Sequence, residues 1–296
     1  MSLSIPMSGP PAIPAVPALA LDTVWFQVAG TLCNLRCRHC FISCGPTNRE
    51  HDYMDRESVR AYLREAEELG VRDIYFTGGE PFLHRELAGI LEDALRVAPT
   101  SVLTNATLIT PEVVRRLAAI RDSSRYSLEM RVSLDGITPR QNDPIRGEGT
   151  FDDALRGARA LADGGFLPII TVAQTWSDAE DREHRAGFHA LLRAKGIDRP
   201  RVKILPLFKI GREESRTRGY APEECLTPAH MEGYDPWLLQ CSTSRMVTNR
   251  GVYVCPILIN VPSARMAATL RESLRPFPLA HGACYTCWAT GASCRN

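Results

Sequence analysis

The stretch VWFQVAGTLCNLRCRHCFISC, residues 24–44, joins an apolar run to a loop that is rich in cysteine. Residues 24–28 have the composition of a buried β-strand. Cys33, Cys37 and Cys40 follow with the spacing C-x3-C-x2-C, so three thiols lie on the loop directly after that strand. Soft thiolates are ligands of iron–sulfur clusters or zinc. Because three cysteines leave one iron of a four-iron cluster open, the stretch predicts a metal site that performs chemistry.

Short apolar runs alternate with helical patterns from residue 24 to residue 205. Asp55 and Thr110 have the side chains of helix N-caps, and Pro111 suits the first turn that follows Thr110. Leu87 begins an apolar stripe with i, i+3, i+4, i+7 spacing, which predicts a helix packed on a sheet. Strands that alternate with helices are typical of a parallel sheet. We expect six strands, at residues 24–28, 73–76, 101–103, 130–133, 168–172 and 202–205.

Glycine and polar residues stand at the ends of several expected strands, where parallel α/β folds bind their ligands. Gly78 and Gly79 follow the second strand, and without a Cβ they let backbone amides approach a ligand. Next to them, the Glu80 carboxylate can accept a hydrogen bond from an ammonium group. Asn105 follows the third strand and Ser133 ends the fourth. Taken singly these are ordinary turn and strand-end residues; beside the three thiols they predict a binding site.

The C-x3-C-x2-C spacing followed by the aromatic Phe41 resembles the signature of the radical S-adenosylmethionine (radical SAM) superfamily. The resemblance implies a 4Fe-4S cluster on the three cysteines, with its open iron chelated by S-adenosylmethionine. Reduction of that cluster would cleave the cofactor to a 5'-deoxyadenosyl radical, which abstracts a hydrogen atom from the substrate. The residues alone leave one alternative, a zinc site with His39 or Cys44 as its fourth ligand.

The same resemblance implies roles for the strand-end residues. Residues 78–80 resemble the family's GGE segment, which contacts the amino group of the cofactor's methionine part. The segment around Ser133 and the later Arg146 resembles a stretch of relatives with SPASM or twitch domains, where serine and arginine help bind the cofactor's carboxylate and ribose; a guanidinium fork suits a carboxylate. The alternatives are that Ser133 is an ordinary strand-end hydroxyl and that Arg146 is a surface charge. The expected cofactor-binding residues are Phe41, Gly78, Gly79, Glu80, Asn105, Ser133 and Arg146.

Cysteines return in the last third of the chain. Cys241 and Cys255, followed by the C-x2-C pair Cys284 and Cys287, resemble a twitch domain or a truncated SPASM domain. The resemblance implies a second, auxiliary 4Fe-4S cluster, with Cys294 as a competing fourth ligand. Four protein ligands favour electron transfer over substrate chelation. A zinc ribbon is the alternative.

Three features depart from these patterns. Cys44 lies outside the family spacing, and we interpret it as a structural thiol. Only three residues separate Gly251 from Cys255, where the family has four, so the local turn can differ. Cys225 fits neither cysteine set; it is a structural thiol, a further ligand, or a catalytic hydrogen-atom donor that quenches a substrate radical.

Composition excludes several classes of partner. Lys+Arg total 35 against 34 Asp+Glu, so no overall charge favours nucleic acid or an anionic membrane. Neither a basic signal-peptide region nor an apolar run of ~18 residues is present, which predicts a cytoplasmic protein. In such a protein the ten cysteines indicate metal ligands rather than disulfides.

We therefore expect an α/β fold with three parts. A proline-rich disordered tail covers residues 1–21, a partial (β/α)6 barrel resembling a TIM barrel covers residues 22–210, and a small cluster-binding domain covers residues 211–296. The expected activity is radical SAM oxidation of a small metabolite, by dehydrogenation or epimerisation, with an external one-electron donor such as flavodoxin or ferredoxin. The alternatives are a ribosomal-peptide maturase, which cross-links or epimerises residues, and a non-catalytic metal-binding or electron-transfer protein.

Overall fold

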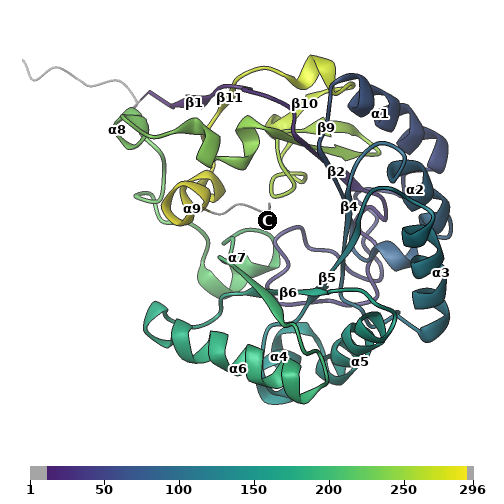
Figure 1. The fold of residues 1–296 in the computed structure, drawn as a ribbon. Coiled ribbons are helices and arrows are strands. Elements are labelled where there is room, and N and C mark those ends of the chain that lie inside the picture. The colour runs from purple at the N-terminus through teal and green to yellow at the C-terminus, as the bar shows by residue number, and fades with distance from the viewer. Residues whose placement is uncertain (1–11, 292–296) are drawn as a thin grey trace, which may run out of the picture.

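The computed structural model describes residues 12–291, which form a nine-stranded sheet, a two-stranded sheet and nine α-helices (Figure 1). The spatial order in the large sheet is β10 (Arg265–Ala267), β9 (Gly251–Tyr253), β8 (Ser244–Thr248), β2 (Thr23–Gln27), β3 (Asp73–Thr77), β4 (Thr100–Thr104), β5 (Leu128–Ser133), β6 (Ile169–Ala173) and β7 (Arg201–Leu205). The small sheet pairs β1 (Ala15–Val16) with β11 (Phe277–Pro278). The helices are α1 (Arg56–Glu68), α2 (Leu87–Ala94), α3 (Pro111–Asp122), α4 (Pro139–Arg146), α5 (Thr150–Asp163), α6 (Asp181–Ala194), α7 (Arg212–Thr217), α8 (Pro228–Met231) and α9 (Gly282–Thr290).

The expected parallel sheet of six strands is confirmed. Strands β2 to β7 lie in chain order, and each is parallel to the next. The sheet is not closed, because β7 and β10 form its two edges. Figure 1 shows α1, α2 and α3 along the outer side of the curved sheet, with α8 and α9 across its open side. The α/β class and the partial-barrel architecture are therefore as the sequence predicted.

Strand β2 is apolar because it is buried on both faces. Successive side chains of a strand point to opposite sides. Val24 and Phe26 belong to the core between the sheet and the outer helices. Trp25 points the other way, into a second core, and stacks on Tyr75 with ring centroids 4.3 Å apart. A strand with two buried faces gives a continuous apolar run rather than an alternating one.

Helices α1 and α3 begin where their capping residues predict. The Asp55 carboxylate accepts from the Ser58 amide at 2.8 Å, and Thr110 accepts from the Val113 amide at 3.3 Å. Pro111 occupies the first turn of α3. On α2 the predicted apolar stripe that starts at Leu87 is buried against the sheet.

Two expectations about the ends of the chain need correction. Residues 12–21 were expected to be part of a disordered tail, but Ala15–Val16 form β1 and Val16 is buried. The reason is pairing with Phe277–Pro278, a partner far along the chain that local composition does not reveal. At the other end, the boundary expected at residue 210 does not divide the sheet, because β8, which lies beyond it, pairs in parallel with β2 and continues the same sheet. Residues 1–11 lie outside the described part.

Candidate functional site

The loop after β2, residues 28–51, is held against the segment that follows β3. The Gly79 amide donates to the Gly30 carbonyl oxygen at 2.8 Å. The neighbouring Glu80 amide donates to the Leu32 carbonyl oxygen at 3.0 Å. A Cβ on Gly79 would lie 2.0 Å from that same Leu32 oxygen. Only glycine allows the two backbones to approach so closely, so this residue sets the position of the cysteine loop.

A cavity of about 230 Å³ opens where the cysteine loop meets the carboxyl ends of β3 to β7. The thiols of Cys33, Cys37 and Cys40 line it together, and Cys44 lies beside them. Residues from the ends of all five of these strands line the same space, which is the arrangement that the parallel sheet predicts. Among the expected cofactor-binding residues, those that line the cavity are Phe41, Gly78, Gly79, Asn105, Ser133 and Arg146.

Glu80 is the expected cofactor-binding residue that does not line this cavity. Its buried carboxylate accepts from the Thr104 hydroxyl at 2.7 Å, the Asn105 amide at 2.8 Å and the Phe82 amide at 3.1 Å. Burial raises the pKa of Glu80 to about 7, against the effect of these donors. The side chain therefore braces the ends of β3 and β4, and its contact with an ammonium group of a ligand stays a prediction.

Hydrogen-bond donors point at the sulfur atoms of the loop. The Leu35 amide donates to Cys33 Sγ at 3.4 Å, and the Cys44 amide donates to Cys40 Sγ at 3.3 Å. Burial raises the pKa of Cys33 to about 12. The pKa of Cys40 is lowered to about 6, chiefly by a hydrogen bond from the Cys44 thiol and further by the charge of Arg212. Amide donors stabilise the thiolates that a soft metal requires, so this donor set suits an iron–sulfur cluster.

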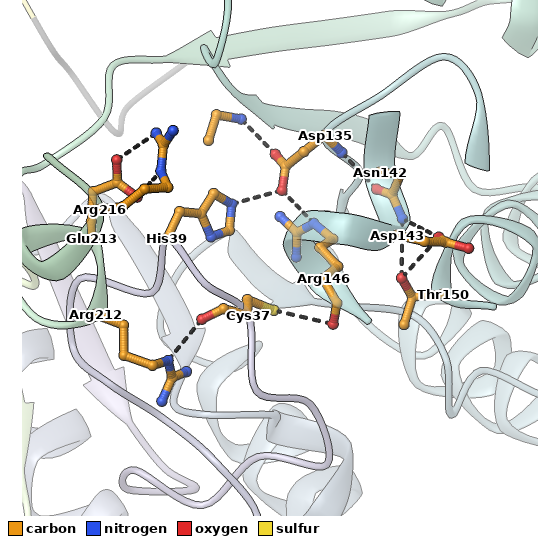
Figure 2. A network of polar contacts seen from close by, with 11 residues as sticks. Cys37, His39, Asp135, Asn142, Asp143, Arg146, Thr150, Arg212, Glu213 and Arg216 are labelled. Carbon is orange, nitrogen blue, oxygen red and sulfur yellow. Dashed lines mark hydrogen bonds and ion pairs between the residues drawn. The ribbon is translucent and has the colours of Figure 1, made fainter. Parts of the chain in front are cut away.

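A buried ion pair supports the other wall of the cavity (Figure 2). Asp135 Oδ2 lies 2.5 Å from Arg146 Nε, in the last turn of α4, and 2.6 Å from His39 Nε2, in the cysteine loop. Since a carboxylate only accepts, the His39 Nε2 nitrogen carries the proton. Burial opposes ionisation of Asp135, but the charges of Arg146 and His39 outweigh it and hold the pKa of this carboxyl well below its usual range. Through Arg146 and His39, the Asp135 carboxylate therefore joins α4 to the loop that carries the thiols.

Two residues that sequence analysis did not single out also line the cavity, Thr171 and Arg212. Thr171 lies opposite Ser133 in the register of β5 and β6, and its buried hydroxyl has no hydrogen-bond partner among residues 12–291. A threonine inside a strand is ordinary, so no sequence signal marked it. Arg212 directly follows residues 206–211, the segment after the last expected strand, so its position near a strand end could have marked it as a site residue.

Four of the C-terminal cysteines meet at a second, much smaller cavity of about 30 Å³: Cys241, Cys255, Cys284 and Cys287. The other residues lining it are almost all apolar. Burial raises the pKa of Cys241 to about 12 and that of Cys284 to about 11. Phe208 and Ile257 line both cavities, and the Phe208 ring lies 5.7 Å from that of Phe41. Apolar side chains thus separate the two cysteine sets.

Two predicted residues remain, Cys225 and Cys294. Cys225 is exposed and is absent from the lining of both. Cys294 lies outside the described residues. Between residues 12 and 291, no helix is both long and apolar enough to cross a membrane.

Residues 28–185, more than half of the chain, match the family model described as the Radical SAM superfamily. Mycofactocin maturase MftC of Mycobacterium tuberculosis is 36% identical over 138 residues, which are 46% of this chain and 34% of that protein. A probable GTP 3',8-cyclase of Methanosarcina mazei is 30% identical over 145 residues, 46% of this chain and 41% of the other. The matched part therefore spans well under half of these curated relatives.

Solved structures share the fold at low sequence identity. Streptococcus suis SuiB bound to precursor peptide SuiA has a TM-score of 0.63 at 18% identity, over 92% of this chain and 72% of the other. Native anSMEcpe with bound AdoMet and Cp18Cys peptide has a TM-score of 0.60 at 16% identity, over 85% and 79% of the two chains. At these identities the likeness supports the architecture alone.

Proposed function

The chain belongs to the radical SAM superfamily, and we propose that it cleaves S-adenosylmethionine reductively in order to modify a peptide. One observation carries the proposal: Cys33, Cys37 and Cys40 line a single cavity at the carboxyl ends of the strands, beside Arg146 and the Gly78-Gly79 backbone. Three thiols in an open, partly polar space suit a cluster that accepts a further ligand, whereas a structural metal site is closed by four. Cys44 also lines the cavity, but its thiol donates to the Gly78 carbonyl oxygen at 3.9 Å.

The residues around the first cavity fit a cluster held by three cysteines. Each of Cys33 and Cys40 receives a backbone amide donor, and a Cβ on Gly79 would lie 2.8 Å from the Cys33 Cβ. The Gly79 backbone therefore lies directly beside Cys33, in a space that any side chain would block. When bound, the cluster and S-adenosylmethionine supply a 5'-deoxyadenosyl radical that removes a hydrogen atom from the substrate.

The chain's own residues would bind and orient the cofactor. The backbone of residues 78–79 faces the cavity and is proposed to contact the amino group. Arg146 uses its Nε for Asp135, which leaves the two Nη groups for a carboxylate. Hydroxyl and amide side chains on adjacent strand ends would bond to the ribose, and an aromatic ring would contact adenine. The residues proposed for these last contacts are Asn105, Ser133 and Phe41.

For the C-terminal cysteines we propose an auxiliary 4Fe-4S cluster in a SPASM-like or twitch-like domain. Convergence of Cys241, Cys255, Cys284 and Cys287 on one apolar cavity supports it, since four thiols complete the ligand set without an open position. Cys294 is the alternative fourth ligand. A structural zinc ion is the competing occupant. Hydrogen donation by Cys225 is not part of the proposal, because its thiol is exposed away from the first cavity.

Reconstitution under anaerobic conditions tests the core of the proposal. Purified protein treated with iron, sulfide and a strong reductant is expected to hold about eight irons and to convert S-adenosylmethionine to 5'-deoxyadenosine. About four irons with cleavage would leave the first site standing and make the second zinc or empty. A reducible cluster without cleavage, also in the presence of substrate fractions, would favour a non-catalytic electron carrier. A reduced flavodoxin or ferredoxin is proposed to replace the chemical reductant.

The substrate is the second part of the proposal. MftC is named a maturase and SuiB binds a precursor peptide, which supports a peptide over the small metabolite expected from the sequence. The resemblance to a GTP 3',8-cyclase keeps a small molecule as the second candidate. Size-fractionated host extract, with or without protease treatment, should be assayed for stimulation of 5'-deoxyadenosine formation. Stimulation that protease removes supports a peptide, whereas stimulation that survives protease in the small-molecule fraction contradicts it.

A further inference from the structure

Arg212, which lies outside the cysteine loop, binds the backbone of that loop at several points. Its Nε donates to the Cys37 carbonyl oxygen at 2.8 Å, and its Nη1 donates to that of Ser43 at 2.9 Å. Its Nη2 donates to the Cys44 carbonyl oxygen, and its backbone amide donates to that of Cys40 at 3.1 Å. One residue, far along the chain, thus binds the loop at four carbonyl groups (Figure 2 shows the bond to Cys37).

Gly211 makes this approach possible. Its φ is +62°, and a Cβ there would lie 2.3 Å from the Phe41 carbonyl oxygen and 2.8 Å from that of Cys40. The backbone of residues 211–212 therefore lies directly against the loop, and any larger residue would push it away. The contact is a built feature of the fold rather than a chance meeting of a long side chain with a surface.

The charge of Arg212 is not balanced as that of Arg146 is. Asp135 lies 2.5 Å from Arg146 and compensates it. For Arg212, by contrast, no ion pair with a carboxylate occurs in the part of the chain that the structure describes, and its hydrogen bonds go to neutral carbonyl groups. Arg212 also lines the cavity that holds Cys33, Cys37 and Cys40. The cavity that holds the thiols is therefore lined by a neutralised arginine and by one whose positive charge remains.

We propose that Arg212 is a positioning residue for the cysteine loop and that its uncompensated charge raises the reduction potential of the cluster bound there. The proposal rests on the assignment of Cys33, Cys37 and Cys40 as cluster ligands. Reduction adds one negative charge to the cluster, and a nearby positive charge in a partly buried site stabilises the reduced form. The carbonyl contacts hold the charge at a fixed place, which a flexible surface arginine would not do.

The test measures the midpoint potential of the reconstituted full chain by potentiometry with electron paramagnetic resonance. The signal that changes on addition of S-adenosylmethionine identifies the first cluster, since only an open iron binds the cofactor. Arg212→Gln removes the charge, and Arg212→Lys keeps it without the guanidinium fork. The matched control is Arg38→Gln, which removes an exposed charge from the same loop, where water screens it.

We expect Arg212→Gln to keep the iron of the first site and to shift its midpoint to more negative potential. Arg212→Lys and Arg38→Gln are expected to stay close to the wild type. An unchanged midpoint in Arg212→Gln, or an equal shift in Arg38→Gln, overturns the proposal. If both Arg212 variants lose the first cluster, the residue only shapes the loop and the effect on potential is refuted. If Arg212→Gln alone loses it, the charge is needed to retain the cluster, which contradicts the proposal that it only tunes the potential of a cluster held by the carbonyl contacts. A wild type without any signal that responds to the cofactor refutes the proposed function instead.

Discussion

The two cysteine regions differ in what surrounds their sulfur atoms. The first set lies in a cavity of about 230 Å³ together with polar residues such as Asn105, Arg146 and Arg212. The second meets at about 30 Å³ of space among apolar side chains. Three thiols with room and polar neighbours suit a site that binds ligands, and four thiols enclosed by apolar side chains suit a closed site. The difference separates a candidate reaction centre from a candidate electron-transfer or structural centre, and each prediction below acts on one side of it.

The largest effect is expected from Cys37→Ala. Loss of one of three thiols leaves the first cluster with two protein ligands, so cleavage of S-adenosylmethionine should fall to background. The second set is untouched and should keep about four irons. Iron analysis and a 5'-deoxyadenosine assay on the same sample check both points. Cleavage at the wild-type rate in this variant would break the comparison, because the first set would not be the reaction centre.

Cys255→Ala removes one thiol of the second cysteine set. The total iron should fall by about half, while S-adenosylmethionine is still cleaved when a chemical reductant is supplied. Complete turnover of substrate should be lost if the second centre carries electrons. Cys225→Ala is the matched control, since its exposed thiol lies at neither cavity, and its iron content should equal that of the wild type. Loss of iron in the control would place Cys225 among the ligands.

Much of this contrast was predictable from the sequence, and the reasons are local. The strands and the helix caps at Asp55 and Thr110 follow from residues that are neighbours in the chain. The two cysteine sets follow from spacing within short segments. The contact of Arg212 with Cys37 joins residues 175 positions apart, and β8 joins the sheet beside β2. Such pairings depend on how whole elements pack, so they cannot be predicted from a local sequence pattern.

A buried ion pair is the next feature of the first region. Asp135→Asn would leave the Arg146 charge buried without its partner, which costs about 3 to 5 kcal/mol in free energy of unfolding. Because the pKa of Asp135 is depressed, this stabilisation is present above the ordinary carboxyl pKa of about 3.9 and is lost as the pH falls below it. Denaturation by urea at neutral pH measures the cost.

Asp163→Asn is the control for that experiment. Asp163 pairs with Arg159 on the exposed surface of α5, where water screens both charges, so the free energy of unfolding should hardly change. Equal effects of the two substitutions would mean that the ion pair on the wall of the first cavity contributes no more than a surface pair.

The last prediction concerns Gly211, where backbone conformation and close approach both require glycine. Gly211 and Gly233 both have positive φ, +62° and +70°. A Cβ on Gly211 would lie 2.3 Å from the Phe41 carbonyl oxygen, whereas one on Gly233 would meet nothing within 4 Å. Alanine costs about 1 kcal/mol at a positive φ in the left-handed region. The cost is larger at Gly211, whose ψ of −136° belongs to a conformation that is essentially restricted to glycine. Only Gly211→Ala must also displace the cysteine loop.

Gly211→Ala should therefore lower the free energy of unfolding by more than Gly233→Ala and should weaken retention of iron at the first site. The second site should keep its iron in both variants, since Gly211 does not line the smaller cavity. Urea denaturation gives the energetic difference, and the signal that responds to S-adenosylmethionine reports the first site. If the two alanine variants are equally stable and retain iron equally, residues 211–212 do not hold the loop. The two cysteine regions would then differ in the side chains that line their cavities and not in the backbone contacts that support them.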